Sequence, residues 1–401
     1  MSTANEAIIE RAKKKLLLNY KQQPIVLVKG EGSYVWDADG KKYLDLLGGI
    51  ATCALGHCHP AVTAAAKAQL DKLWHCSNVF YSEPQIQLAE KLTAASGLKD
   101  ARAFFCNSGA EANEALIKLA RRAQKDRGQK ERFEILTFEN SFHGRTLATL
   151  TATGQTKYQA GFEPLPAGFR HLPYGSLEAV EKAIDAKTAA ILVEPIQGEG
   201  GVRPAPEGFL KGLRALCDKH GLLLLVDEVQ TGLGRTGKAF AYQHEGILPD
   251  AFSLAKALGN GLPIGAMVCT DEVSKALPSG THGSTFGGNL VTAAAANVAF
   301  AMCTDPAMME ENVAKGRYAS ELARTLIAKK GDVVKEFRGR GMLFGLELSG
   351  PAGDVVARCR QNGLLVNLAG EKTVRFAPPY TVTREQLVEG FTLFEKSLNP
   401  V

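Results

Sequence analysis

The apolar run Leu222–Val226, followed directly by Asp227-Glu228, restricts the fold of this chain more than any other segment. Five consecutive apolar residues between Gly221 and two acidic residues are typical of a short, fully buried strand. Open sheets that contain such strands bind their ligands beyond the carboxyl ends of the strands. We therefore expect Asp227 to lie where the ligand chemistry of an α/β sheet takes place.

Lys256 follows Asp227 by 29 residues, inside a short apolar and glycine-rich stretch. Its apolar neighbours leave the ammonium form poorly solvated, which favours the neutral amine. A neutral amine can form a Schiff base with a carbonyl group. A Schiff-base lysine and a carboxylate for a pyridinium nitrogen are what pyridoxal 5'-phosphate (PLP) requires. A charged strand end and an exposed helix lysine would give the same spacing, so the pair alone does not decide between a cofactor site and an ordinary surface.

Composition excludes several other classes of protein. The chain has 401 residues with 45% hydrophobic and 22% charged residues, and its net charge is only +5. We expect no nucleic-acid partner, because no basic run carries interleaved aromatic residues. No apolar run approaches the roughly 18–20 residues of a membrane span. The eight cysteines form no CxxC pair and suit a reducing cytoplasm. His57-Cys58-His59 is too closely spaced for a structural zinc site, so we predict no metal.

The order of predicted elements divides the chain into a large and a small domain. From about residue 50 to 305, strand-like and helix-like segments alternate, which indicates a mostly parallel sheet with helices on both faces. An amphipathic helix over 1–20 and short strands precede this region, and a long helix, strand pairs and a final helix follow it. We predict a small α+β domain built from both ends of the chain. Its segments are 1–50 and 306–401, around a large domain over 51–305.

The segment Asn107-Ser-Gly-Ala-Glu111 follows a strand-like run and opens a predicted helix. Ser108, Gly109 and Ala110 would present small side chains and free backbone N–H groups there, which favours a phosphate group. Ser108 and Glu111 also match a capping box, and both roles can hold together.

A glycine-rich segment, Gly232–Lys238, matches GxGxxG but lies five residues after the strand rather than in a tight turn. It nearly matches a P-loop, yet Ala239 replaces the Ser or Thr that binds magnesium. We therefore reject nucleotide binding at this segment and expect Arg235 and Lys238 to be solvated.

Three further side chains could contact a cofactor or substrate. Phe142 could stack on a planar ring or belong to the core, and Arg145 could clamp a carboxylate or lie free on the surface. Arg375 stands in the apolar strand-like segment Thr373–Ala377 and needs an anionic partner, from the protein or from a ligand.

Taken in order, these segments closely resemble the class III (ω-amino acid) aminotransferases of PLP fold type I, over nearly the whole chain. The resemblance implies an α/β fold with a mostly parallel seven-stranded sheet in the large domain, a bound PLP, and a homodimer with shared active sites. The motifs that carry it are Gly56-His-Cys-His-Pro60, Asn107–Asn113, Phe142-His-Gly-Arg145, Glu194-Pro-Ile-Gln-Gly-Glu-Gly200, Asp227-Glu-Val-Gln230-Thr-Gly and His282-Gly-Ser-Thr285-Phe-Gly-Gly.

The resemblance also implies a role for each matching cofactor residue. Lys256 would bond covalently to the cofactor and move the substrate proton, and Asp227 would pair with the pyridinium nitrogen. Gln230 would hydrogen-bond the phenolic oxygen, and Phe142 would stack on the ring. The phosphate would be held by Ser108, Gly109 and Ala110, together with Thr285 from a second subunit.

For the substrates, the resemblance is greatest to family members that act on acylated ornithine. It implies transfer of the δ-amino group of N2-acetylornithine to 2-oxoglutarate. Arg145 and Arg375 would bind the two α-carboxylates, and Glu199 would neutralise Arg375 while the terminal amine reacts. Ile50 cannot hydrogen-bond, which suits an acylated α-nitrogen. Ornithine and succinylornithine stay open as alternatives, as does a PLP-dependent aminomutase of the same fold.

Overall fold

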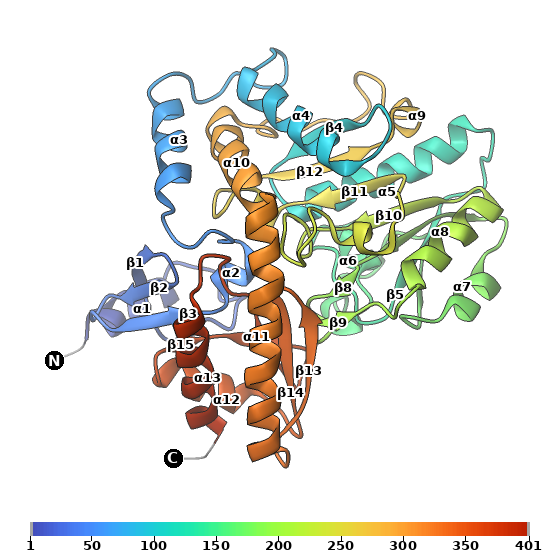
Figure 1. Cartoon of the computed structure of the whole chain (residues 1–401). Coiled ribbons are helices and arrows are strands. Elements are labelled where there is room, and N and C mark those ends of the chain that lie inside the picture. The colour runs from blue at the N-terminus through green and yellow to red at the C-terminus, as the bar shows by residue number, and fades with distance from the viewer. Residues whose placement is uncertain (1–2, 399–401) are drawn as a thin grey trace.

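The computed structural model describes residues 3–398, and a seven-stranded sheet lies at its centre (Figure 1). The strand order is β4-β12-β11-β10-β7-β5-β6, in which β12 is antiparallel to both neighbours and the other adjacent pairs are parallel. The predicted mostly parallel sheet of an α/β fold is therefore confirmed. The strands are β4 (Arg102–Cys106), β12 (Gly265–Cys269), β11 (Ala251–Leu254), β10 (Leu223–Asp227), β7 (Thr188–Val193), β5 (Glu134–Phe138) and β6 (Phe169–Leu172).

The middle strand β10 shows why this sheet is covered on both faces. Successive side chains of a strand point to opposite faces. Leu223 and Leu225 belong to the apolar cluster that includes helix α5 (Gly109–Asp126), whereas Leu224 and Val226 belong to the cluster that includes α8 (Phe209–His220). A strand that is apolar at every position is thus buried between two layers of helices, as the run Leu222–Val226 predicts.

Further helices and short 3-10 helices connect and flank the strands of this sheet. They are α3 (Pro60–Leu70), α4 (Glu83–Ser96), α6 (Leu147–Ala152), η1 (Thr156–Tyr158), α7 (Leu177–Ala183), η2 (Ala241–Glu245), η3 (Lys256–Leu258), α9 (Asp271–Ser274) and α10 (Leu290–Cys303).

Two four-stranded sheets are formed by the ends of the chain. In the first sheet, β3 of the N-terminal part pairs in parallel with β15 of the C-terminal part, which ties the two ends together. Both ends of the chain lie on the same side of the molecule in Figure 1. The first sheet contains β1 (Leu27–Glu31), β2 (Tyr34–Asp37), β3 (Lys42–Asp45) and β15 (Leu364–Leu365). The second contains β13 (Val334–Arg340), β14 (Leu343–Leu348), β17 (Thr373–Phe376) and β16 (Asn367–Ala369).

The remaining elements complete this part of the molecule and its connection to the large sheet. They are α1 (Ala4–Lys13), α2 (Gly48–Ala51), the strand pair β8 (Ile196–Gln197) and β9 (Arg203–Pro204), α11 (Pro306–Lys330), α12 (Gly353–Gln361) and α13 (Arg384–Leu398). We propose domain segments of 1–50, 51–305 and 306–401; residues 1–2 and 399–401 of these segments lie outside the described residues.

Two of the predicted helices differ from those in the structure. The helix predicted over 1–20 ends at Lys13, and Leu16, Leu17 and Leu18 are exposed beyond it. A run of three lysines supplies no apolar stripe that could hold a longer helix against the core. The long helical region after Asn289 is broken at Thr304-Asp305, where Asp305 caps the N-terminus of α11.

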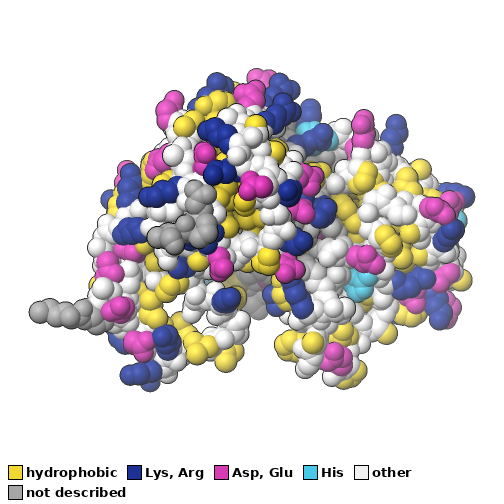
Figure 2. All heavy atoms as spheres, turned by 90° about the horizontal axis from the view of Figure 1, so that it is seen from below, with side chains coloured by type: hydrophobic (Ala, Val, Ile, Leu, Met, Phe, Trp, Pro, Cys, Tyr) yellow, Lys and Arg dark blue, Asp and Glu magenta, His cyan; other side chains and the backbone are white. Residues whose placement is uncertain are grey.

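Helix length and surface charge bear on possible partners. No single helix in residues 3–398 is long and apolar enough to cross a membrane; α10 and α11 pass that test only as a pair, by length and composition, and they are bent by 64° at their break. Basic and acidic side chains are interspersed over the face shown in Figure 2, where a hollow separates two lobes at the lower edge.

Candidate active site

A cavity of about 390 Å³ opens at the carboxyl ends of the parallel strands. It is lined by the segments that directly follow five of these strands, as expected for an open α/β sheet. The lining includes Asn107–Ala110 after β4, Phe142–Arg145 after β5, Glu194 after β7, Asp227, Val229 and Gln230 at the end of β10, and Lys256 after β11. The structure therefore brings together in one cavity most of the residues that the sequence analysis singled out.

Asp227 is buried and held in one orientation by three hydrogen-bond partners. Its Oδ2 accepts a hydrogen bond from Asn113 Nδ2 at 2.7 Å and lies 2.9 Å from His143 Nδ1. Its Oδ1 accepts from the backbone N–H of Val229 at 3.0 Å. Asn113 and His143 are also buried, and sequence reasoning assigned neither of them a role although both stand in the motifs it quoted. The carboxylate is thus rigidly placed at the wall of the cavity.

Lys256 is the first residue of η3 and adopts a left-handed backbone conformation, with φ at 44°. Its side chain borders the cavity. Burial, together with the nearby charge of Arg375, lowers the pKa of Lys256 to about 8, although Glu199, Asp227 and Glu194 oppose the shift. Near neutral pH the neutral amine is therefore much more abundant than in an ordinary lysine, and the neutral amine is the nucleophilic form.

Arg375, Glu199 and Gln230 form one polar cluster beside the cavity. Arg375 Nη1 contacts Glu199 Oε1 at 2.5 Å and donates to Gln230 Oε1 at 3.1 Å. Burial alone would raise the pKa of Glu199, but the charges of Arg375 and Lys256 outweigh it and lower the pKa of that carboxyl. Arg375 is fully buried and its Nη2 has no hydrogen-bond partner. A buried donor without a partner fits a site that accepts an anionic ligand group.

Arg145 differs from Arg375 because its side chain is exposed and borders the cavity. Its guanidinium lies 4.0 Å from the ring centre of Tyr158 and 5.6 Å from that of Phe142. No carboxylate of residues 3–398 forms an ion pair with it, so it is available to an anion from solution. Two arginines therefore adjoin the cavity, one exposed and one buried against an acid.

The first turn of α5 also borders this cavity. Ser108 caps the helix, since its Oγ accepts a hydrogen bond from Glu111 N at 3.2 Å. Backbone N–H groups in a first helical turn have no partner within the helix, so those of Gly109 and Ala110 are available to an anion. A Cβ on Gly109 would approach Val229 to 2.9 Å, so only glycine fits there without a shift of the neighbour. Thr285 is exposed and does not line the cavity of this chain.

Glu194 was missed as a functional candidate, although it stands in a motif that the sequence analysis quoted. Its Oε2 accepts from Phe142 N at 3.0 Å and its Oε1 accepts from Gly198 N at 3.3 Å. Burial, reinforced by the charge of Asp227, raises the pKa of Glu194 well above its usual range. Glu194 joins the Phe142 segment to the loop that carries Glu199.

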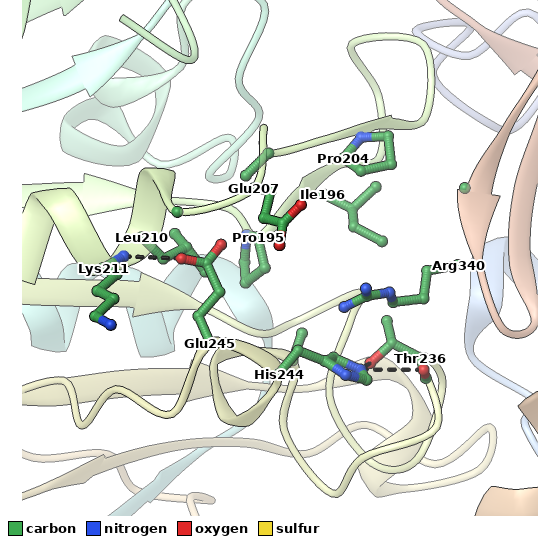
Figure 3. Close-up of a pocket in the computed structure, with 14 residues that line it drawn as sticks. Pro195, Ile196, Pro204, Glu207, Leu210, Lys211, Thr236, His244, Glu245 and Arg340 are labelled. Carbon is green, nitrogen blue, oxygen red and sulfur yellow. Dashed lines mark hydrogen bonds between the residues drawn. The ribbon is translucent and has the colours of Figure 1, made fainter. Parts of the chain in front are cut away.

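A larger cavity, of about 670 Å³, lies next to the segment Pro195–Ile196 (Figure 3). Its charged side chains are of both signs, and Glu207, Lys211 and Arg340 among them are exposed. His244 in its wall is held by Thr236, with Nε2 at 3.1 Å from both oxygens of that residue. No buried lysine or fixed carboxylate of the kind seen around Asp227 is present in its lining, so we assign the chemistry to the smaller cavity.

The arrangement around the smaller cavity fits PLP. The N-terminus of α5 can take the phosphate, Asp227 is held by Asn113 and His143 for contact with a ring nitrogen, and Lys256 has a lowered pKa. An α/β fold with this site defines a PLP-dependent enzyme of fold type I.

Comparison with known proteins gives the family. Residues 18–398 match the aminotransferase class-III family. The acetylornithine aminotransferase of Myxococcus xanthus is 63% identical over 386 residues, which cover 96% of each chain. The crystal structure of N-acetylornithine aminotransferase from Stenotrophomonas maltophilia is 38% identical with a TM-score of 0.84, covering 97% of this chain and 98% of that one. The ornithine aminotransferase of Toxoplasma gondii has a TM-score of 0.94 at 33% identity, covering 99% and 95%. The chain belongs to the class III aminotransferases, which depend on PLP.

Proposed function

We propose that this enzyme transfers the δ-amino group of N2-acetyl-L-ornithine to 2-oxoglutarate. The products are N-acetylglutamate 5-semialdehyde and L-glutamate, and the reaction is a step of arginine biosynthesis. The name and high identity of the Myxococcus xanthus relative support this substrate. The observation in the structure that carries the proposal is the contact between Arg375 and Glu199 beside Lys256, because it suits a site that must accept a terminal amine and then a dicarboxylate.

The residues around the cavity would have separate roles in the reaction. Bound PLP supplies a ring that accepts electrons from the substrate carbon. Asp227 would hold a proton on the ring nitrogen, and Lys256 Nζ would move the proton between the substrate carbon and the C4′ carbon of the cofactor. Gln230 and Phe142 would hold the ring in place. The phosphate would be bound by Ser108, Gly109 and Ala110.

The two arginines would serve the two carboxylates. Arg145 has no acidic partner among the described residues and would bind the α-carboxylate of the amino donor. While the terminal amine reacts, Glu199 would keep Arg375 neutralised. When 2-oxoglutarate enters, Glu199 would turn away and Arg375 would bind the α-carboxylate bidentately. Without Glu199, two unpaired arginines would favour glutamate in both half-reactions.

We further propose a homodimer with shared active sites. Thr285 and Phe286 are exposed and directly follow Ser284, whose Oγ accepts a hydrogen bond from Asn107 Nδ2 at 3.1 Å, in the segment after β4. Large apolar side chains that are exposed in the single chain include Trp74, Val79, Phe80, Tyr81 and Phe286. Exposed apolar groups of this size mark an interface with another protein surface. A second subunit at this face would bring its Thr285 to the phosphate site. The free cysteines suit a cytoplasmic enzyme.

The first experiment is a half-reaction. The PLP-loaded protein would be mixed separately with N-acetylornithine, ornithine, succinylornithine and 4-aminobutyrate, and loss of the cofactor's absorbance band would be followed by stopped flow. We expect N-acetylornithine to react fastest. Fastest reaction with ornithine would overturn the argument from Ile50, and fastest reaction with succinylornithine would change the acyl group. No change with any amine would refute transamination.

A further inference from the structure

The segment Gly48–Ala51 winds in the left-handed sense. Its four residues have φ values of 57°, 63°, 64° and 63°. The first two are glycines, but Ile50 and Ala51 are L-residues for which this conformation is unfavourable, and the β-branched Ile50 is the more unusual of the two. Backbone strain of this kind persists only where the surrounding structure fixes the segment, and such places are often beside functional sites.

This left-handed turn lies at the edge of the candidate active site. Thr52, the next residue, lines the cavity. The turn contacts η3, which begins with Lys256. Ala51 packs in an apolar cluster with Ile196 and Val202, which flank the loop of Glu199 in the sequence. A shift of the turn would therefore change the shape of the cavity and the surroundings of Glu199.

The start of the turn is held by Asp45. One oxygen of its carboxylate accepts hydrogen bonds from the backbone N–H groups of Leu47 at 2.9 Å and Gly48 at 3.0 Å. The other oxygen lies 2.7 Å from His57 Nε2. These contacts fix the first residue of the turn and leave its last residues, where the strain lies, to be held by something else.

Arg235 holds the end of the turn. Its Nη2 donates to the carbonyl oxygen of Ala51 at 3.3 Å, and its Nη1 donates to those of Met342 at 3.0 Å and Pro378 at 2.6 Å. The guanidinium also lies 4.5 Å from the ring centre of Tyr380. The side chain is only 1% exposed, and no carboxylate of residues 3–398 forms an ion pair with it.

A buried cation without an acidic partner is costly, and an apolar side chain of similar volume would fill the same space. What an apolar side chain cannot do is bond three carbonyl groups from separate parts of the chain. Arg235 joins the left-handed turn to the β13–β14 connection and to Pro378, which follows β17, the strand of Arg375. Its planar, branched donor group is suited to several acceptors at once.

We propose that Arg235 is a positioning residue that sets the left-handed turn Gly48–Ala51 against the strand of Arg375 and thereby shapes the donor end of the active site. The positioning itself follows from the contacts of Arg235. The expected effect of Arg235 on binding of the amino donor rests on the proposed function.

Hydrogen exchange tests the positioning without any reaction. The backbone N–H groups of Thr52 and Cys53 both donate to Gly48 O at 2.8 Å, so they report whether the turn is closed. In the PLP-loaded protein without substrate, we expect Arg235→Met to exchange these amides on the order of tenfold faster than the wild type. Arg235→Lys keeps the charge and should restore part of the protection. The matched control is Arg214→Met, which removes an arginine of α8 that is paired with Asp250, and it should leave these amides unchanged.

Steady-state kinetics tests the expected effect of Arg235 on the amino donor. We expect Arg235→Met to raise KM for N-acetylornithine by about tenfold with a smaller effect on kcat, because the donor end of the site is no longer fixed. Arg235→Lys should recover part of the loss.

Unchanged exchange at Thr52 and Cys53 in a folded Arg235→Met would overturn the proposal, whatever the kinetics. If neither variant folds, exchange in the wild-type protein is the test. Amides of Thr52 and Cys53 that exchange as fast as those of the exposed residues 15–20 would overturn the proposal, and strong protection of these two amides would support it. A wild type that shows protected amides but no reaction with any amine would instead refute the proposed function.

Discussion

Removing the carboxylate of Glu199 should change the preference of the enzyme between its two substrates. In the structure, Glu199 Oε1 lies 2.5 Å from Arg375 Nη1, and Arg375 is fully buried, so solvent screens the pair little. Under the proposed function, glutamate or 2-oxoglutarate would have to displace Glu199 before it could bind Arg375, whereas N-acetylornithine would not. In Glu199→Ala, that displacement is no longer required.

The size of the effect follows from the contact. A hydrogen bond to a charged group contributes about 1.5–3 kcal/mol. Since 1.4 kcal/mol corresponds to a factor of ten, the ratio of kcat/KM for glutamate to that for N-acetylornithine should rise by about 10- to 150-fold. Arg375 keeps three other acceptors in the variant, Gly198 O, Gln230 Oε1 and Asn367 Oδ1, so we expect the protein to remain folded.

The assay is a pair of single-turnover half-reactions, one with each amino donor, followed by stopped-flow absorbance. Glu199→Gln should give a smaller change, because it loses the charge and keeps a hydrogen-bonding oxygen. Glu207→Ala is the matched control: it removes an exposed glutamate between β9 and α8 that has no ion pair among the described residues. A ratio in Glu199→Ala within twofold of the wild type would refute the switch.

Four other predictions test the active site and the residues that support it. Lys256→Ala should bind PLP without a covalent bond and lose transamination; turnover, or a cofactor still fixed by borohydride in mass spectrometry, would contradict the assignment. Because burial lowers the pKa of Lys256 to about 8, the rate of PLP attachment to the cofactor-free protein should rise with pH up to about 8 and then level off, and a flat profile between pH 6.5 and 9.5 would be inconsistent with a reactive neutral amine. Asn113→Ala should lower the free energy of unfolding by about 1–3 kcal/mol, measured by thermal denaturation, since it leaves Asp227 Oδ2 with one buried donor fewer; an unchanged Tm would contradict this. Gly234→Ala should fail to fold or lose most of its stability in the same measurement, because φ is 80° there and a Cβ would lie 2.0 Å from Cys303 O; a wild-type Tm would show that the neighbouring backbone moves freely.

Much of the fold was predictable because single segments of the sequence determine it. The run Leu222–Val226 differs from β10 by one residue at each end, since an unbroken apolar run between Gly221 and two acids has few other uses. The same reasoning found the segments that follow the strands, and these line the cavity. The local sequence pattern was sufficient to place a residue wherever its position depended only on its own strand or helix.

The sequence could not predict contacts whose partners are distant along the chain. Arg235 was expected to be solvated, and this prediction was wrong: the side chain is buried because carbonyl groups of Ala51, Met342 and Pro378 converge on it. Nothing near Arg235 in the sequence signals these acceptors. The same limit applies to Asn113 and His143, which reach Asp227 only when α5 and the segment after β5 pack beside β10.

The neighbouring acids Asp227 and Glu228 show how geometry separates roles that the sequence leaves together. Both are buried at the end of β10, yet only Asp227 lines the cavity, as alternation along an extended chain would require. Glu228 Oε2 instead accepts from Thr231 Oγ1 at 2.5 Å, and its Oε1 accepts from Tyr242 N at 2.9 Å. Burial raises the pKa of Glu228 to about 7. Glu228 therefore holds the glycine-rich connection after β10 in place, and that connection carries Arg235. Asp227 lines the cavity, and Glu228 supports the connection that carries Arg235, the residue proposed to position the turn Gly48–Ala51.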